Sequence, residues 1–64
     1  MGIWFIITYY NQQTKETETE EVWASLFGNP WQKAFDKAMQ GITERFEKDK
    51  YWCLKSIEDN TYRG

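Results

Sequence analysis

The feature that most constrains the fold is residues 3–10, Ile-Trp-Phe-Ile-Ile-Thr-Tyr-Tyr. Their β-branched and aromatic side chains favour a strand, and both sets of alternating positions are apolar. A strand that is apolar on both faces belongs in the centre of a sheet, where other elements cover it. We therefore predict a central strand over residues 3–11.

The next segment, residues 14–24, alternates Thr with Glu before it becomes apolar at residues 22–24. This period of two is typical of an edge strand, polar at its start, that pairs with the first strand through a turn at residues 11–13. The alternative is an irregular acidic loop over residues 12–20, and the sequence leaves both interpretations open.

Asn29-Pro30 predicts the start of a helix over residues 30–48, because Asn is a preferred N-cap and Pro a preferred first helical residue. Gly41 costs about 1 kcal/mol relative to Ala inside a helix. The helix either continues through Gly41, which the unbroken apolar pattern favours, or ends there with Thr43 capping a second helix. The residues spaced three and four apart form one apolar stripe: Trp31, Ala34, Phe35, Ala38, Met39, Ile42 and Phe46.

Ala34, Ala38 and Gly41 lie along one side of this helix, so their small size would let its backbone approach the sheet. Leu26 and Phe27, in the connection before the helix, are expected to plug the open end of the core. Residues 51–57 predict a last strand.

The order strand, strand, helix, strand predicts one α+β domain over residues 1–64. We expect a three-stranded antiparallel sheet of order 2-1-3, with one amphipathic helix packed on one face. The other face then has no cover within the chain. Its aromatic side chains would form an exposed patch of the kind that marks an interaction site.

The residue types present exclude the common enzymatic and metal chemistries. The chain has no His and one cysteine, Cys53, so we predict no metal site, no internal disulfide, no cofactor and no catalytic residue. Its four glycines match no phosphate-binding loop. Cys53 lies in an apolar strand, where a small buried side chain is the expected role.

Charge and aromatic residues supply the candidate binding site. The net charge of −2 argues against nucleic acid as a partner. Glu16, Glu18 and Glu20 would lie about 7 Å apart on one strand face, where they either steer a basic partner or simply prevent strand addition. Trp4, Tyr10 and Tyr51 are the predicted aromatic anchors for a protein partner.

The lone cysteine and the lack of a leader or membrane-spanning pattern lead us to expect a cytoplasmic protein with no membrane contact.

The run Val22-Trp23-Ala24-Ser25, followed by Asn29-Pro30-Trp31-Gln32-Lys33-Ala34-Phe35, resembles a strand-to-helix junction in small ββαβ proteins encoded by phages and mobile elements. The resemblance spans residues 3–57 and implies an inhibitor of host machinery, such as a defence nuclease, in the host cytoplasm.

Three functions follow as hypotheses. The leading one is a non-enzymatic protein–protein interaction module, an inhibitor or modulator that works by covering a surface of its partner. The first alternative is a small homodimeric structural protein whose aromatic sheet face is the dimer interface. The second is a single-stranded nucleic-acid binder that stacks bases on the sheet aromatics.

Overall fold

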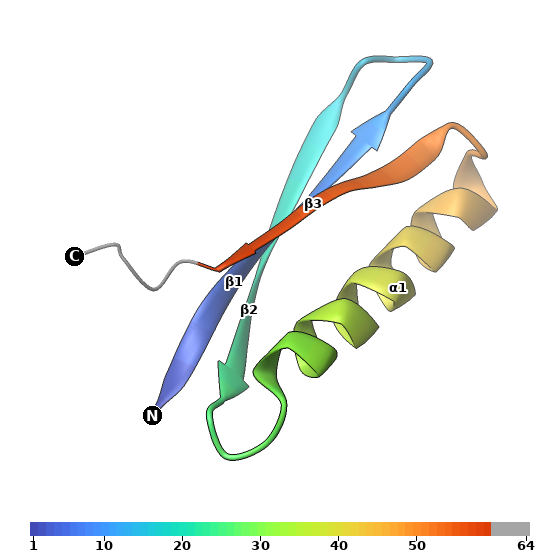
Figure 1. The fold of residues 1–64 in the computed structure, drawn as a ribbon. Coiled ribbons are helices and arrows are strands. Elements are labelled where there is room, and N and C mark those ends of the chain that lie inside the picture. Colours follow the sequence, from blue (N-terminus) through green and yellow to red (C-terminus); the bar gives the residue numbers. More distant parts are fainter. Residues whose placement is uncertain (60–64) are drawn as a thin grey trace.

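The computed structural model describes residues 1–59, which contain three strands and one helix (Figure 1). Strand β1 spans Gly2–Asn11, β2 spans Thr17–Ser25, helix α1 spans Pro30–Lys48, and β3 spans Trp52–Asp59. The predicted α+β class and strand–strand–helix–strand order are confirmed.

Strand β1 is the centre of the sheet, whose order is β2-β1-β3, and it runs antiparallel to both neighbours. We call the sheet face toward α1 the inner face; there Phe5, Ile7 and Tyr9 of β1 are fully buried. The opposite, outer face carries the other alternating positions of β1, which are Trp4, Ile6, Thr8 and Tyr10. The apolar run thus supplies both faces, as its composition predicted.

The turn between β1 and β2 is organised by Asn11, whose side chain is buried. Its Oδ1 accepts hydrogen bonds from the backbone N–H groups of Gln13 at 2.9 Å and Thr14 at 3.0 Å. Lys15 then adopts a left-handed backbone with φ of 67°. Strand pairing therefore begins only at Thr17, so the prediction of a strand from residue 14 is wrong for its first three residues.

Helix α1 has the predicted bounds and continues through Gly41. The Asn29 side chain caps it by accepting a hydrogen bond from the Gln32 N–H at 3.1 Å, and Pro30 is its first residue. At the other end the Asp49 N–H donates to the Arg45 carbonyl at 2.9 Å. Asp49 also accepts a hydrogen bond from the Tyr51 N–H, so Tyr51 lies in the turn and β3 begins at Trp52.

The helix packs on the inner face through its smallest residues, Ala34, Ala38 and Gly41, which are all buried. A Cβ on Gly41 would overlap the hydroxyl of Tyr9 and lie 2.7 Å from its Cζ. Glycine is therefore what lets the helix backbone pass over this tyrosine, which confirms the packing reason predicted for it.

The rest of the apolar stripe is in part a correction to the sequence prediction: Ile42 packs against the core, but four larger residues stay about half exposed. Trp31, Phe35, Met39 and Phe46 are between 45% and 57% exposed. These residues lie up to about 140° around the helix from Ala34, at 100° per residue, and a narrow sheet contacts only one side of a helix. The expected core plug is also wrong, since Leu26 and Phe27 are 46% and 89% exposed.

Strand β3 contains a bulge opposite the step from Thr8 to Tyr9. Tyr9 pairs with Leu54, whereas Thr8 pairs with Ser56, so Lys55 is the extra residue. As a result Leu54 and Ile57 both point to the inner face, where they pack against the buried core.

Candidate functional site

The predicted acidic row is divided by the fold. Glu16 precedes β2, in the turn, and is exposed. Glu18 and Glu20 lie opposite Tyr9 and Ile7, so their side chains are on the inner side of β2, toward α1. Glu18 Oε1 lies 2.9 Å from Arg45 Nε, and Glu20 Oε2 accepts a hydrogen bond from the Tyr9 hydroxyl at 3.0 Å. These two carboxylates therefore have partners inside the chain.

Arg45 is the centre of this polar network. Its guanidinium carbon lies 3.8 Å from the centroid of the Tyr9 ring, a cation–π distance, and Nη1 donates to the Gly41 carbonyl at 3.1 Å. Burial, followed by the hydrogen bond to Glu20, raises the pKa of Tyr9 to about 12. The raised pKa keeps the Tyr9 phenol protonated at neutral pH, so its hydroxyl donates the hydrogen bond to Glu20.

Two hollows, of about 320 and 350 Å³, flank Arg45. The first lies between β2 and α1 and is lined mainly by Glu20, Lys37, Gln40 and Glu44. Small-molecule sites of this volume are lined mainly by apolar and aromatic side chains. Opposite charges and polar groups line this hollow instead, which does not fit that class of site.

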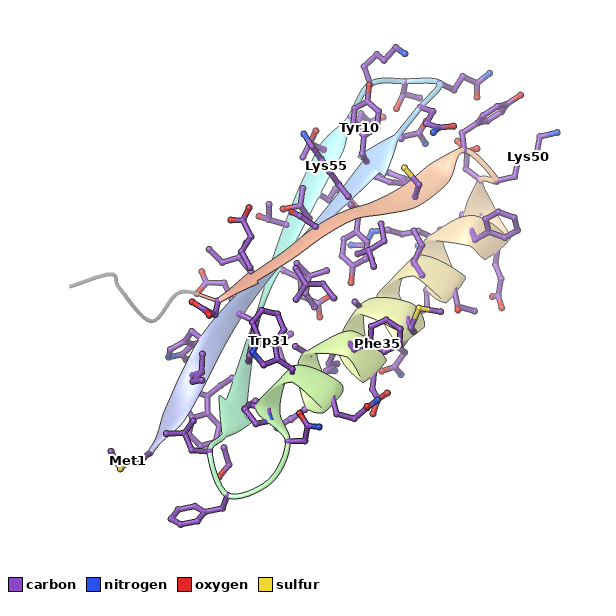
Figure 2. All side chains as sticks on the ribbon, in the orientation of Figure 1. Met1, Tyr10, Trp31, Phe35, Lys50 and Lys55 are labelled. Atoms are coloured by element: carbon purple, nitrogen blue, oxygen red, sulfur yellow. The ribbon has the colours of Figure 1, made fainter. Side chains whose placement is uncertain are left out.

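The three predicted aromatic anchors are also separated. Trp4 lies near the start of β1 and is 49% exposed, whereas Tyr10 lies near its end, about 20 Å away at the rise of a strand. Tyr51 belongs to the Tyr10 end, because its carbonyl accepts a hydrogen bond from the Gln12 N–H at 2.9 Å. Figure 2 shows Met1 and Tyr10 at opposite ends of β1, with Lys55 beside Tyr10.

Trp4 has a neighbour that the sequence analysis did not select. Trp23 lies directly opposite it in the pairing of β1 with β2, on the outer face, and is 43% exposed. The Trp23 ring covers Gly2, since a Cβ there would overlap the ring. The exposed Leu26 and Phe27 follow in the loop at the same end, held by a 3.2 Å hydrogen bond from the Leu26 N–H to the Met1 carbonyl. We call Trp4, Trp23, Leu26 and Phe27 the tryptophan end.

Beyond the tryptophan end the outer face becomes polar. Ile6 lies between Glu21 and Glu58, and Thr8 lies between Thr19 and Ser56. The aromatic side chains expected to form one exposed patch on the outer face are therefore divided between its two ends, because the two edge strands place charged or hydroxyl side chains beside the middle of β1. Trp23 could have been found from the alternation of β2, which sets it on the face opposite to Val22 and Ala24.

A second exposed apolar group lies on α1. We call Trp31, Phe35, Met39 and Phe46 the helix ridge. Figure 2 shows Trp31 between α1 and the sheet, and Phe35 over the ribbon of α1 in this view. Trp31 also contacts the core, with its ring centroid 4.7 Å from that of Phe5 in an edge-on arrangement. Sequence periodicity identified these residues as apolar but assigned them to the core.

Among residues 1–59, no group of three or more potential metal ligands comes together. Cys53 is half-buried, and its thiol donates to the Tyr10 carbonyl at 3.3 Å. The helix of the described chain is not long and apolar enough to cross a membrane.

Comparisons with protein-family models, with curated proteins and with solved structures each found no match to this chain.

Proposed function

We propose that the chain is a non-enzymatic protein-binding module that covers a surface of a partner protein, in the manner of small phage-encoded inhibitors. The observation that carries this proposal is the cross-strand pair Trp4–Trp23 on the outer sheet face, which no element of residues 1–59 covers. Tryptophan is enriched among the residues that dominate interface energy, and each of these two has roughly half of its surface available.

The tryptophan end has the size expected of a binding site. An aromatic side chain offers roughly 150–250 Å², so two half-exposed tryptophans and an almost fully exposed Phe27 present on the order of 400 Å². The largest apolar patch on a typical monomer is of this size and often functional.

The acidic residues have a smaller part in this proposal than the sequence suggested. Glu18 is paired with Arg45 and Glu20 is bound by Tyr9, so Glu16 is the member of the row best placed to steer a basic partner. Glu21 and Glu58, on either side of Ile6, add negative charge to the outer face itself. We therefore expect a partner whose contact surface is basic around an apolar centre.

The test is affinity capture from cells of the source organism on the immobilised chain, followed by binding measurements with each purified captured protein. The double variant Trp4→Ser, Trp23→Thr should bind a genuine partner at least about a hundredfold more weakly than wild type, because two hot-spot side chains are removed. Phe35→Gln, an equally exposed aromatic on the other side of the molecule, is the matched control and should bind within about threefold of wild type. A partner that binds the double variant as tightly as wild type would refute the proposal.

The polar centre of the outer sheet face argues against the alternative in which two copies of the chain pack these faces together as a homodimer. Dimer interfaces are more apolar than the rest of a protein surface, whereas Glu21, Glu58 and a row of hydroxyl residues occupy the centre of this one. A surface that stacks nucleic-acid bases needs basic side chains around it to bind the phosphate backbone. Glu21 and Glu58 would instead repel the phosphates at this face.

A further inference from the structure

We infer that the open edge of β2 receives an extended, basic segment of a partner protein, which pairs with β2 as a fourth strand of the sheet. This inference rests on the proposed function, since it describes how a partner bound at the tryptophan end continues along the strand that carries Trp23.

Strand β2 is an outer strand of the sheet and presents a regular row of backbone groups at its open edge. The Asn11 N–H donates to the Glu16 carbonyl at 2.9 Å, and the Leu26 N–H donates to the Met1 carbonyl at 3.2 Å, at the two ends of the pairing with β1. In the alternating antiparallel ladder, even-numbered residues of β2 are therefore the ones hydrogen-bonded to β1. The N–H and C=O groups of the odd-numbered residues face away from β1: Thr17, Thr19, Glu21 and Trp23.

The two outer strands of the sheet differ in how well they could pair with another strand. In β3 the bulge at Lys55 interrupts the row of backbone groups. Bulges and lysines at a sheet edge oppose the addition of a strand. Strand β2 contains no lysine and pairs with β1 without a bulge, so it is the edge suited to a further strand.

The first of the two hollows beside Arg45 opens at this edge. Thr19 pairs with Thr8 and so has its side chain on the outer face, yet it lines the hollow together with Gln40 and Glu44 of α1. A residue of the outer face borders a space beside α1 only where that space reaches around the strand edge. A strand added to β2 would therefore place a side chain in this hollow of about 320 Å³.

The charges around the hollow favour a basic side chain. Glu20 and Glu44 contribute two carboxylates, and Lys37 and Arg45 contribute two cations. The charge of Arg45 is already balanced by Glu18, whose Oε1 lies 2.9 Å from Arg45 Nε. Two carboxylates therefore remain against Lys37, and we expect a Lys or Arg of the added strand opposite Glu20.

The outer side of the same edge extends this pattern. Strand β2 contains no basic residue, so a second Lys or Arg belongs opposite Glu21. The requirement differs at Trp23, because Lys33 Nζ lies 6.0 Å from the centroid of its ring and already places a cation there. An apolar side chain opposite Trp23 would instead extend the tryptophan end.

The glutamates of β2 also exclude a second copy of this chain as the added strand. Antiparallel pairing of two β2 strands about residue 19 sets Glu18 opposite Glu20 of the other copy. Pairing about residue 20 or residue 21 sets Glu20 or Glu21 opposite itself. Like charges directly opposite each other destabilise a strand pair, so the edge selects a different, basic strand.

The first test uses the synthetic peptide acetyl-Ile-Val-Lys-Arg-Thr-Lys-Thr-amide, designed to lie antiparallel to β2. Its Ile lies opposite Trp23, its first Lys opposite Glu21 and its Arg opposite Glu20. Titration of the isotope-labelled full chain, followed by NMR, should give a Kd below about 1 mM. Hydrogen exchange should slow at the amides of Thr19 and Glu21 and stay unchanged at Leu54 on the opposite edge of the sheet.

Methylated peptides separate strand pairing from simple charge attraction, because methylation of the backbone nitrogen keeps every charge. Methyl groups on the first Lys and first Thr remove two donors that face β2, and affinity should fall at least about tenfold. Methyl groups on Val and Arg, whose N–H groups face away from β2, should leave the affinity within about threefold. Equal affinity of the two methylated peptides, or no binding of the unmethylated peptide at about 1 mM, would overturn the inference.

A pair of variants at residue 19 applies the same test to the protein. Thr19→Pro removes an N–H that makes no bond to β1, a change that an edge strand accepts, and it should weaken peptide binding at least about tenfold. Thr19→Val keeps that N–H and should bind within about threefold of wild type. Unchanged far-UV circular dichroism shows that both variants are folded, and equal binding by the two would contradict the fourth strand.

The same variants separate this inference from the proposed function. A purified partner that binds Trp4→Ser, Trp23→Thr weakly but binds Thr19→Pro as tightly as Thr19→Val would refute the fourth strand alone. A partner that is indifferent to the tryptophan double variant, while the peptide binds as expected, would refute the proposed function alone.

Discussion

Gly41 offers the sharpest test of how the helix and the sheet fit together. Replacing glycine by alanine inside a helix normally stabilises a protein by about 1 kcal/mol. Here the added methyl group overlaps the Tyr9 hydroxyl, so the helix or the tyrosine must shift. Overpacking of this kind costs about 1–3 kcal/mol. Losing the hydrogen bond from Tyr9 to the Glu20 carboxylate adds about 1.5–3 kcal/mol.

We therefore expect Gly41→Ala to lower the free energy of unfolding by about 1.5–5 kcal/mol, despite its better helix propensity. The matched experiment repeats the change in a Tyr9→Leu background, where the obstructing ring is gone. There Gly41→Ala should stabilise the protein by about 1 kcal/mol, so the sign of its effect reverses.

Urea unfolding, followed by far-UV circular dichroism at one protein concentration, measures the free energy of unfolding of wild type, the two single variants and the double variant. The fixed concentration matters because association would contribute to the apparent stability. If Gly41→Ala stabilises the protein in the wild-type background, the close approach of α1 to Tyr9 is not what determines this position.

Three further measurements probe the polar contacts. Because the pKa of Tyr9 is raised, its contribution to the free energy of unfolding is fully present below pH 10 and falls by about 2–3 kcal/mol as the pH rises to about 12. Tyr9→Phe should remove that fall in urea titrations made over a series of pH values. Lys15→Gly should stabilise the protein by about 1 kcal/mol in thermal unfolding, because glycine adopts the left-handed backbone of residue 15 without strain. Hydrogen bonds from the Tyr51 N–H and the Asn11 amide lower the pKa of Asp49. The contribution of Asp49 to the free energy of unfolding is therefore present above pH 3.8 and is lost as the pH falls further. Asp49→Asn should abolish this loss of stability in acid, and an unchanged dependence of stability on acidic pH would contradict the prediction.

Most of the fold follows from local patterns. Residues 3–10 identify the central strand, and Asn29-Pro30 fixes the start of α1 to the residue, because an N-cap and a first-turn proline depend only on neighbouring backbone groups. The order of the elements then leaves few topologies for a chain this short, and the predicted sheet order is the observed one.

The candidate site was predicted less well, because each of its residues depends on contacts between distant parts of the chain. Alternation along β2 correctly places Glu18 and Glu20 on one face. It cannot show that the face is turned toward Arg45 of α1, which removes most of their freedom to steer a partner. In the same way, the pairing register brings Trp23 beside Trp4, and no property of either residue alone predicts that pair.

The sequence alone determined that α1 is a helix with a broad apolar stripe and that β1 is apolar on both faces. Tertiary structure decided which part of the stripe is buried. Tyr9 rises from the inner face beneath Gly41, so the helix makes its closest contact through its glycine and alanines. The larger apolar residues then remain at the side of α1, because three strands are too narrow to cover them. That division leaves the helix ridge exposed, and it follows from the shape of the packed elements rather than from the hydrophobicity of any residue.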